Sequence, residues 1–210
     1  MTNATNPSAA TTIDPSSRPV RHAAVALILY ERAGRPWAIF TRRTECVADH
    51  KGQICLPGGS RDREDATLLA TALRETAEEI GVDPALLKPV AALETVYTVA
   101  TRYYIHPFVF YTPDRPTMLP ADAEVAEILD VPIEPLLDDG VCRVERWDTH
   151  GVARDVYFFD YGSLTIWGAT GRVLRHFLDI YSEAWWQGVR TGKVTLSLAE
   201  ETDAGRMIPV

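Results

Sequence analysis

The sequence contains little cysteine, which limits what can hold the fold together. Its 210 residues include three cysteines, Cys46, Cys55 and Cys142, an odd number without C-x-x-C spacing. Such a set favours free thiols in a reducing compartment over a disulfide framework or a zinc site. The fold must then depend on a hydrophobic core, and a composition that is 46% hydrophobic supplies the material for one.

The sequence also lacks long apolar segments. No uninterrupted apolar run is long enough to span a bilayer, and the N-terminus has neither the basic region nor the apolar core of a secretory signal. We therefore expect a cytoplasmic protein. Residues 1–19 are rich in Ser, Thr, Ala, Asn and Pro, have little to bury, and are expected to form a flexible tail.

Positive charge is the third deficit. Lysine and arginine number 21 against 29 acidic residues, so the net charge is −8. This balance argues against a general affinity for nucleic acid or anionic membranes, and we expect neither as a partner. An anionic substrate would need a local basic patch or a metal ion.

The most informative stretch is a pair of glycines followed by a helix with an acidic face. It reads LPGGSRDREDATLLATALRETAEEIGV and starts at Leu56. At about 100° per residue, Glu75, Glu78 and Glu79 fall within an arc of roughly 100°. Gly81 suits the left-handed position just past a helix end. A separate face can pack on a core and comprises Leu69, Ala72, Leu73, Thr76 and Ile80.

Two explanations fit the three glutamates. A solvated acidic surface is the ordinary explanation of a lone E-x-x-E-E pattern. Alternatively, a divalent cation such as Mg²⁺ or Mn²⁺ relieves the repulsion between neighbouring carboxylates, because hard cations prefer oxygen ligands. The glycine pair before the helix would let the backbone approach such a ligand closely.

The stretch resembles the Nudix box, whose pattern is G-x5-E-x7-R-E-U-x-E-E-x-G-U with U aliphatic. The matching residues are Gly59, Arg74, Glu75, Glu78, Glu79, Gly81 and Val82. The first acidic position is Asp65 instead of Glu, eight residues instead of seven separate it from Arg74, and Thr76 occupies an aliphatic position. The one-residue expansion is similar to the coenzyme A pyrophosphatase branch of the family.

A second signature of that branch, L-L-T-x-R-S-A-x3-R-x3-G-x3-F-P-G-G, is similar to the segment before the box. The chain keeps Thr41, Arg43, Gly52, Pro57, Gly58 and Gly59. It departs at Thr44 and Glu45, has Leu56 in place of Phe, and has Ala48 in place of an arginine that could meet a substrate phosphate. His50 and Lys51 are the nearby candidates to replace that arginine. Ordinary surface charge is the alternative explanation for Arg43 and Lys51.

The patterns together indicate an α/β protein, and the resemblance implies an α/β/α sandwich with a mixed central sheet. We expect a Nudix domain over residues 20–187 and a C-terminal extension over 188–210. Apolar runs predict strands at 22–30, 37–43, 88–98, 103–111, 141–147 and 156–161. Helical periodicity predicts helices at 122–132 and 164–186.

The resemblance implies a role for each matching residue. Glu75, Glu78 and Glu79 would hold Mg²⁺ or Mn²⁺ together with the carbonyl of Gly59, and Arg74 would orient one of the glutamates. Water would be the nucleophile.

Two further groups of residues follow from the same resemblance. The base would be Glu75 or Glu124, the latter lying in an E-V-x-x-I-x-x-V-P segment that the branch shares; a carboxylate at a helix N-terminus is its alternative explanation. Asp65 would stabilise the loop before the helix. Substrate-binding candidates are Thr41, Arg43, His50, Lys51 and Gly58.

The resemblance further implies hydrolysis of a diphosphate in a nucleotide derivative. Coenzyme A or an acyl-coenzyme A, giving 4′-phosphopantetheine and adenosine 3′,5′-bisphosphate, is the favoured substrate. The segment that begins Ile166-Trp167-Gly168 also resembles the coenzyme A branch. ADP-ribose or a dinucleotide is the alternative, and a non-catalytic nucleotide sensor is a third reading, although such domains usually lose box carboxylates. Homodimers are common in the family, so a homodimer is compatible with the resemblance.

Overall fold

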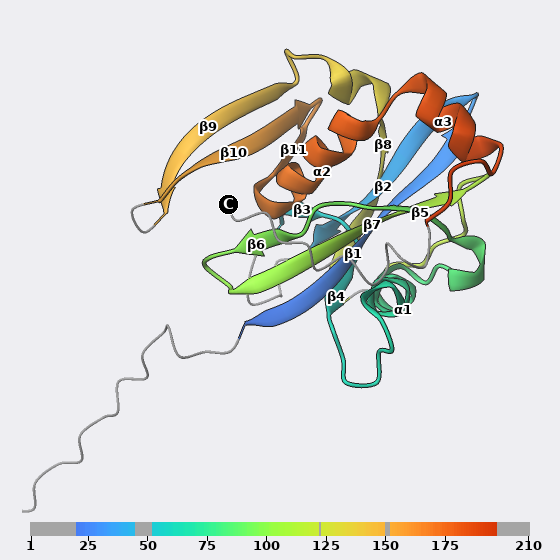
Figure 1. Cartoon of the computed structure of the whole chain (residues 1–210), viewed down its shortest axis with the longest axis horizontal. Helices are drawn as coiled ribbons and strands as arrows, with labels where there is room; N and C mark the ends of the chain where they lie inside the picture. Colours follow the sequence, from blue (N-terminus) through green and yellow to red (C-terminus); the bar gives the residue numbers. More distant parts are fainter. Residues whose placement is uncertain (1–19, 45–51, 122, 150–151, 197–210) are drawn as a thin grey trace, which may run out of the picture.

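Figure 1 shows the computed structural model of the chain, which describes residues 20–44, 52–121, 123–149 and 152–196. These residues form a mixed eight-stranded sheet, a three-stranded antiparallel sheet and three α-helices. The large sheet contains β1 (Arg21–Arg32), β2 (Arg35–Arg43), β3 (Ile54–Cys55), β4 (Gly58–Ser60), β5 (Lys88–Ala92), β6 (Val96–Thr98), β7 (Tyr103–Thr112) and β8 (Val125–Pro132). The small sheet contains β9 (Cys142–Thr149), β10 (Val152–Tyr161) and β11 (Leu164–Trp167), and the helices are α1 (Leu68–Ile80), α2 (Gly168–Ile180) and α3 (Glu183–Arg190).

Strand β1 is the centre of the large sheet. It pairs in parallel with β7 from Arg21 to Tyr30, and antiparallel with β2 and with the short strand β4. Strand β8 continues the sheet beyond β2, and β5 and β6 pair with β7. One parallel pair within otherwise antiparallel pairing makes the sheet mixed, as the resemblance implied.

The residues of β1 are buried on both faces of the sheet, which explains the continuous apolar run in the sequence. Ala26, Ile28 and Tyr30 belong to the core beneath α1, whereas Leu27 and Leu29 belong to the core beneath α2 and α3. Figure 1 shows α1 on one side of the large sheet and α2 with α3 on the other. The predicted α/β/α sandwich is therefore confirmed.

Helix α1 ends at the glycine that the sequence indicates. The hydroxyl of Thr67 caps its start by accepting a hydrogen bond from the backbone N–H of Ala70. Gly81 ends it with φ of 66°, and its N–H bonds to the carbonyl of Ala77. Ala72 and Ile80 are fully buried on the predicted apolar face.

The helix predicted over residues 122–132 is wrong, because this segment contains β8. The error has a structural cause in a register shift of the β2–β8 pairing between Arg42 and Arg43. Val125 and Ile128 consequently pack in the core of α1, while Leu129 packs in the opposite core. A strand with apolar residues at this spacing imitates the i, i+3, i+4 pattern of a helix.

Two other segments are divided where the sequence suggested single elements. The segment predicted as one helix over 164–186 contains β11, α2 and the start of α3. Helix α2 is capped at its C-terminal end by Tyr181. The hydroxyl of Ser182 then caps the start of α3 by accepting a hydrogen bond from the N–H of Trp185. The predicted strand 88–98 consists of β5 and β6. Helix α3 also spans the boundary placed between residues 187 and 188. No helix in the described ranges is both long and apolar enough to cross a membrane.

Close packing of α2 on β10 leads to a stability prediction at Gly171. A Cβ atom added there would lie 2.5 Å from the backbone carbonyl oxygen of Tyr157. Gly171→Ala should therefore lower the free energy of unfolding by about 1–3 kcal/mol, although helix propensity alone predicts a gain of about 1 kcal/mol. Denaturant titration measures the change.

Gly188→Ala in α3 is the matched control. Its added Cβ would meet the end of the Val194 side chain at 2.8 Å, which can rotate away, so a change within about 1 kcal/mol is expected. If Gly171→Ala were as stable as the unmodified protein, α2 would not be held tightly against β10.

Candidate active site

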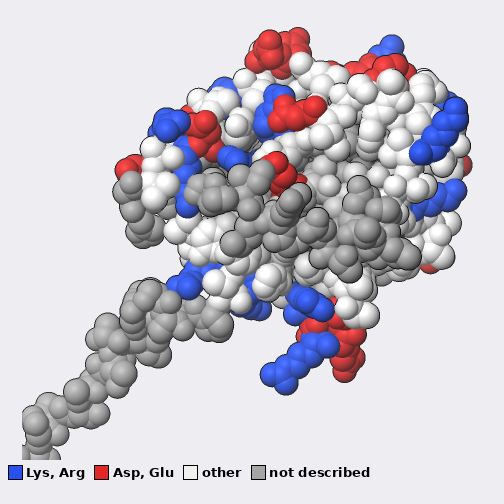
Figure 2. All heavy atoms as spheres, viewed as in Figure 1, with Lys and Arg blue, Asp and Glu red and all other residues white. Residues whose placement is uncertain are grey.

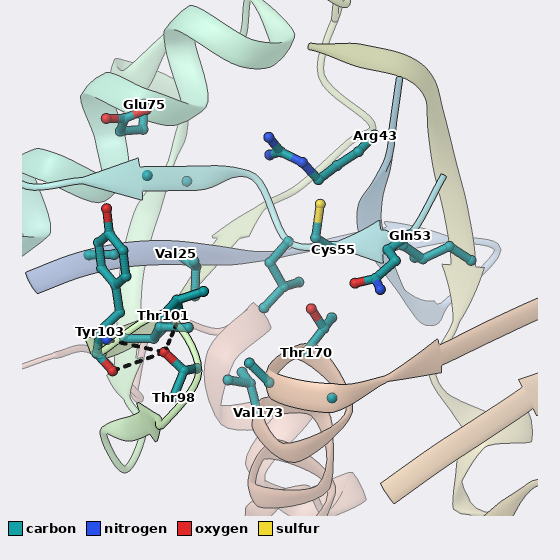
Figure 3. Close-up of a pocket in the computed structure, with 18 of the residues that line it drawn as sticks. Val25, Arg43, Gln53, Cys55, Glu75, Thr98, Thr101, Tyr103, Thr170 and Val173 are labelled. Atoms are coloured by element: carbon teal, nitrogen blue, oxygen red, sulfur yellow. Dashed lines mark hydrogen bonds between the residues drawn. The ribbon is translucent and has the colours of Figure 1, made fainter. Parts of the chain in front are cut away.

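A cavity of about 580 Å³ opens between the acidic helix α1 and the first turn of α2. Its walls come from segments far apart in the sequence. In Figure 3, Glu75 from α1 lies on one side, Thr170 and Val173 from α2 lie on the opposite side, and Arg43 and Cys55 lie between them. The acidic lining residues are Glu75, Glu79 and Glu124.

The guanidinium of Arg74 fixes helix α1 to strand β4. Its Nε and Nη2 donate to the two carboxylate oxygens of Asp65, each at 2.9 Å. Nη2 also donates to the carbonyl of Ser60 at 3.1 Å and to Glu75 Oε1 at 3.0 Å, and Nη1 reaches Glu78 Oε2 at 3.0 Å. This bidentate pair holds the pKa of Asp65 well below its usual range, chiefly through the hydrogen bonds from Arg74.

The two glycines of β4 bring the backbone against the glutamates. Gly58 has φ of 145°, and its N–H donates to Glu79 Oε2 at 3.0 Å. A Cβ at Gly58 would lie 2.3 Å from the carbonyl oxygen of Ala24, and a Cβ at Gly59 would lie 2.3 Å from Glu75 Oε2. Only glycine allows this approach of strand and helix.

The two inward-facing glutamates carry unfavourable negative charge. Burial raises the pKa of Glu79 to about 7; the Gly58 N–H and Arg43 oppose this rise, and the charges of Glu124 and Glu75 add to it. Burial also raises the pKa of Glu75, with the hydrogen bond from Arg74 acting against it. The cavity is therefore a place where a cation would stabilise the ionised carboxylates.

The remaining walls can bind an anionic and partly apolar ligand. Arg43 lines the cavity, and its buried Nε has no hydrogen-bond partner within the described part of the chain. Figure 3 shows the Tyr103 side chain, which rises from β7, with its hydroxyl directed toward the side of Glu75. Trp167 and Val173 contribute apolar surface on the α2 side.

Sequence comparison identifies relatives along most of the chain. The family model of the NUDIX domain matches residues 20–144. Nudix hydrolase 22, chloroplastic, of Arabidopsis thaliana is 38% identical over 170 residues, which cover 76% of this chain and 56% of that protein. The Nudix hydrolase NudL of Yersinia pestis (strain Pestoides F) is 31% identical over 158 residues, covering 74% of this chain and 77% of NudL.

The chain belongs to the Nudix hydrolase family. A solved structure agrees at the level of the fold: a MutT/nudix family protein from Enterococcus faecalis superposes with a TM-score of 0.51 at 13% sequence identity. The match covers 85% of this chain and 66% of that one. The chain spans little more than half the length of the Arabidopsis relative.

Nudix hydrolases generally use divalent metal ions, and the donor set of the cavity suits Mg²⁺ or Mn²⁺. Glu75 and Glu79 offer hard carboxylate oxygens, and the backbone of Gly59 lies beside Glu75. No three acidic, histidine or cysteine side chains among the described residues already surround one point. An ion would require these side chains to move closer together, and it would oppose the burial and, to a smaller extent, the neighbouring negative charges that raise the pKa of Glu79.

The structure brings together most of the residues that the Nudix resemblance singled out. Glu75, Glu79 and Glu124 line the cavity, as do Arg43 and the glycine pair. Glu78 does not line it; its exposed carboxylate pairs with Arg74. Thr41 does not line it either, since its buried hydroxyl contacts the thiol of Cys55 at 3.3 Å. His50 and Lys51 lie outside the described residues.

The motif comparison missed several residues of the cavity. Gln53, Cys55, Tyr103 and Thr170 face it. Gln53 and Cys55 lie between two matched glycines of the second signature. Thr170 ends the segment that begins Ile166-Trp167-Gly168. The sequence resemblance could therefore have indicated these three residues as part of the site. No sequence pattern indicated Tyr103, because only the parallel pairing of β7 with β1 brings it beside Ser60.

The raised pKa of Glu79 predicts how stability depends on pH without metal. The folded protein binds the proton of Glu79 more tightly than the unfolded chain does. The resulting contribution to the free energy of unfolding is fully present below pH 4.5 and is lost as the pH rises through about 7. The loss is about 3 kcal/mol. Thermal unfolding in EDTA between pH 4.5 and 8 should show this decline, and Glu79→Gln should flatten it. An unchanged slope in the variant would contradict the assignment.

The anchoring of Arg74 predicts a large cost for Asp65→Asn. The neutral amide loses the bidentate ion pair and cannot accept from all its present donors, so unfolding free energy at neutral pH should fall by about 2–4 kcal/mol. Because the pKa of Asp65 is depressed, this difference should shrink as pH falls below 3.8. Asp62→Asn is the control, since only the backbone N–H and carbonyl of Asp62 bond to Asp65. Equal denaturation midpoints for both variants would contradict the prediction.

Proposed function

We propose that this Nudix hydrolase cleaves the diphosphate of coenzyme A or an acyl-coenzyme A. The products are 4′-phosphopantetheine, or its acylated form, and adenosine 3′,5′-bisphosphate. The observation that carries the proposal is the convergence of the segments similar to the coenzyme A branch. Arg43, the 53–59 segment, Glu124 and the Trp167–Thr170 segment all line one cavity.

The cavity has the two kinds of surface that this substrate needs. Glu75 and Glu79, with Arg43, occupy the part suited to a cation and a diphosphate. The α2 side adds apolar surface from Trp167 and Val173, together with Val25 and Ile105 from the sheet. A pantetheine or acyl-pantetheine arm is a long, weakly polar chain that fits such a wall.

The reaction adds water across the phosphoanhydride bond. The water oxygen bonds to one phosphorus atom, the bond from that phosphorus to the bridging oxygen breaks, and the leaving phosphate keeps the electron pair. When bound, divalent ions supply charge neutralisation and activate the nucleophile. Arg43 lies where it can stabilise phosphate oxygens, and Arg74 keeps Glu75 in a fixed orientation.

Glu124 is the better candidate for the base that accepts the water proton. One oxygen of Glu75 already accepts a hydrogen bond from Arg74. Glu124 lines the same cavity, and its carboxylate forms no ion pair within the described residues. It enters from the loop before β8, where its carbonyl accepts from the N–H of Thr44 at 3.0 Å, so its backbone is held.

A cytoplasmic location and a homodimer remain predictions. The few cysteines support a reducing compartment. Thiols Cys55 and Cys142 are free in the structure. Size-exclusion chromatography with light scattering measures the oligomeric state directly.

A substrate panel tests the proposal. The purified protein is incubated with Mg²⁺ or Mn²⁺ and coenzyme A, acetyl-coenzyme A, ADP-ribose, NADH or a diadenosine polyphosphate, and products are identified by mass spectrometry. Metal-dependent release of adenosine 3′,5′-bisphosphate is expected. AMP from ADP-ribose or a dinucleotide, with coenzyme A intact, would reject the coenzyme A assignment. No turnover of any compound would favour nucleotide sensing.

Glu79→Gln is expected to lower kcat by at least about a hundredfold, because it removes the buried carboxylate that faces the cavity. Its fold should be retained, as the neutral side chain suits the buried position. Glu78→Gln is the matched comparison and should have a smaller effect, because Glu78 is exposed and does not line the cavity. Steady-state rates and circular dichroism provide the readouts; wild-type turnover in Glu79→Gln would defeat the assignment.

A further inference from the structure

A second hollow, of about 330 Å³, lies beside the active-site cavity. It is lined by Arg21, His22, Ser60, Arg61, Asp62 and Arg63, which come from β1, the end of β4 and the loop that follows β4. In Figure 1 this loop projects from the body next to α1, and Figure 2 shows basic and acidic side chains together at the same edge of the molecule. The motif comparison assigned it no role.

The two hollows share one lining residue, Ser60. Ser60 lines both, and its hydroxyl lies 2.9 Å from the hydroxyl of Tyr103, which lines the active-site cavity. The Arg21 guanidinium donates to Ser60 Oγ at 3.3 Å and lies 4.8 Å from the centre of the Tyr103 ring. Ser60 directly follows Gly59, so their Cα atoms are about 3.8 Å apart. The two hollows therefore share a wall at Ser60, and a nucleotide-sized ligand that extends past this residue would contact both.

The arginines of the second hollow differ from most others in the described part of the chain. None of the three forms an ion pair with a carboxylate there. Arg61 donates to the backbone carbonyls of Asp65 and Ala66, and Arg21 contacts a hydroxyl and a ring. By contrast, carboxylates pair with Arg35, Arg42, Arg74, Arg115, Arg143, Arg146, Arg175 and Arg190.

The charge of the hollow matches a phosphate monoester. Three arginines against the single carboxylate of Asp62 leave a net charge of +2 when His22 is neutral. A phosphate monoester carries about −1.5 to −2 charges at neutral pH, and guanidinium groups bind phosphate oxygens in bidentate geometry. Because the protein as a whole is acidic, with a net charge of −8, this local excess of arginine requires an explanation.

We propose that the second hollow binds a phosphate monoester that the substrate carries apart from its diphosphate. The inference rests on the proposed function, under which this group is the 3′-phosphate of the coenzyme A ribose. The hollow would then supply the cation that the sequence lacks at Ala48. It would also make the enzyme select substrates that carry this phosphate over otherwise identical molecules without it.

The test compares coenzyme A with dephospho-coenzyme A, which differs only by the 3′-phosphate. The unmodified enzyme should have a kcat/KM at least about tenfold higher for coenzyme A, because one charge-assisted contact to the 3′-phosphate is lost in dephospho-coenzyme A. Arg63→Gln should reduce this ratio severalfold, and Arg61→Gln should do the same. Arg63 is exposed and forms no hydrogen bond or ion pair among the described residues, so its replacement should not disturb the fold.

Arg146→Gln is the control, because Arg146 pairs with Asp155 on the β9–β10 hairpin. It should leave the ratio unchanged. A ratio near one in the unmodified enzyme, or the same ratio in Arg63→Gln as in the unmodified enzyme, would overturn the proposal.

A binding experiment separates this inference from the proposed function. Adenosine 3′,5′-bisphosphate and AMP are titrated calorimetrically into the protein without turnover. Tighter binding of the bisphosphate, lost in Arg63→Gln, supports the hollow even if coenzyme A is not hydrolysed. Equal affinities for the two nucleotides overturn it. Inorganic phosphate binding as tightly as the bisphosphate would assign the hollow to a free anion and would also overturn the substrate role.

Discussion

The position of the acidic helix depends on the guanidinium of Arg74. This one group joins α1 to the loop carboxylate of Asp65, to the backbone of β4 at Ser60, and to Glu75. It therefore sets the distance between the glycine strand and the glutamates. The family resemblance placed a glutamate at the position of Asp65. The shorter carboxylate still forms the full bidentate pair across the expanded loop.

Arg74 neutralises the carboxylates unequally, and that inequality determines the chemistry of the cavity. Glu75 accepts a hydrogen bond from it, and Glu78 pairs with it at the surface. Glu79 has only the N–H of Gly58 and the more distant charge of Arg43 to offset its burial. An uncompensated, buried carboxylate is costly in a closed protein. A hard cation would make it favourable, which agrees with the general use of divalent metal ions by Nudix hydrolases.

An acidic protein must still attract an anionic substrate. Figure 2 shows positive and negative side chains interspersed over the visible face and no field of one sign. Eight arginines of the described chain pair with carboxylates, whereas Arg43 in the cavity and the arginines of the neighbouring hollow form no ion pair with a described carboxylate. Recognition would thus rely on a few local guanidinium groups, whose effect is short-ranged under physiological salt.

The sequence by itself determined the family, the acidic face of α1, its capping by Gly81 and the doubly buried β1. These features are local, because the spacing of residues on one helix or a single run of apolar residues indicates them without information from the rest of the chain. Tertiary structure alone decided that Val125–Pro132 is a strand, because the segment pairs with β2. A register shift in that pairing places Val125 in the same core as Ile128, while Leu129 packs in the opposite core. It also decided that Glu78 faces solvent while Glu79 faces the cavity. Long-range strand pairing brings Tyr103 beside Ser60, and no local pattern encodes a contact between residues so far apart in the chain.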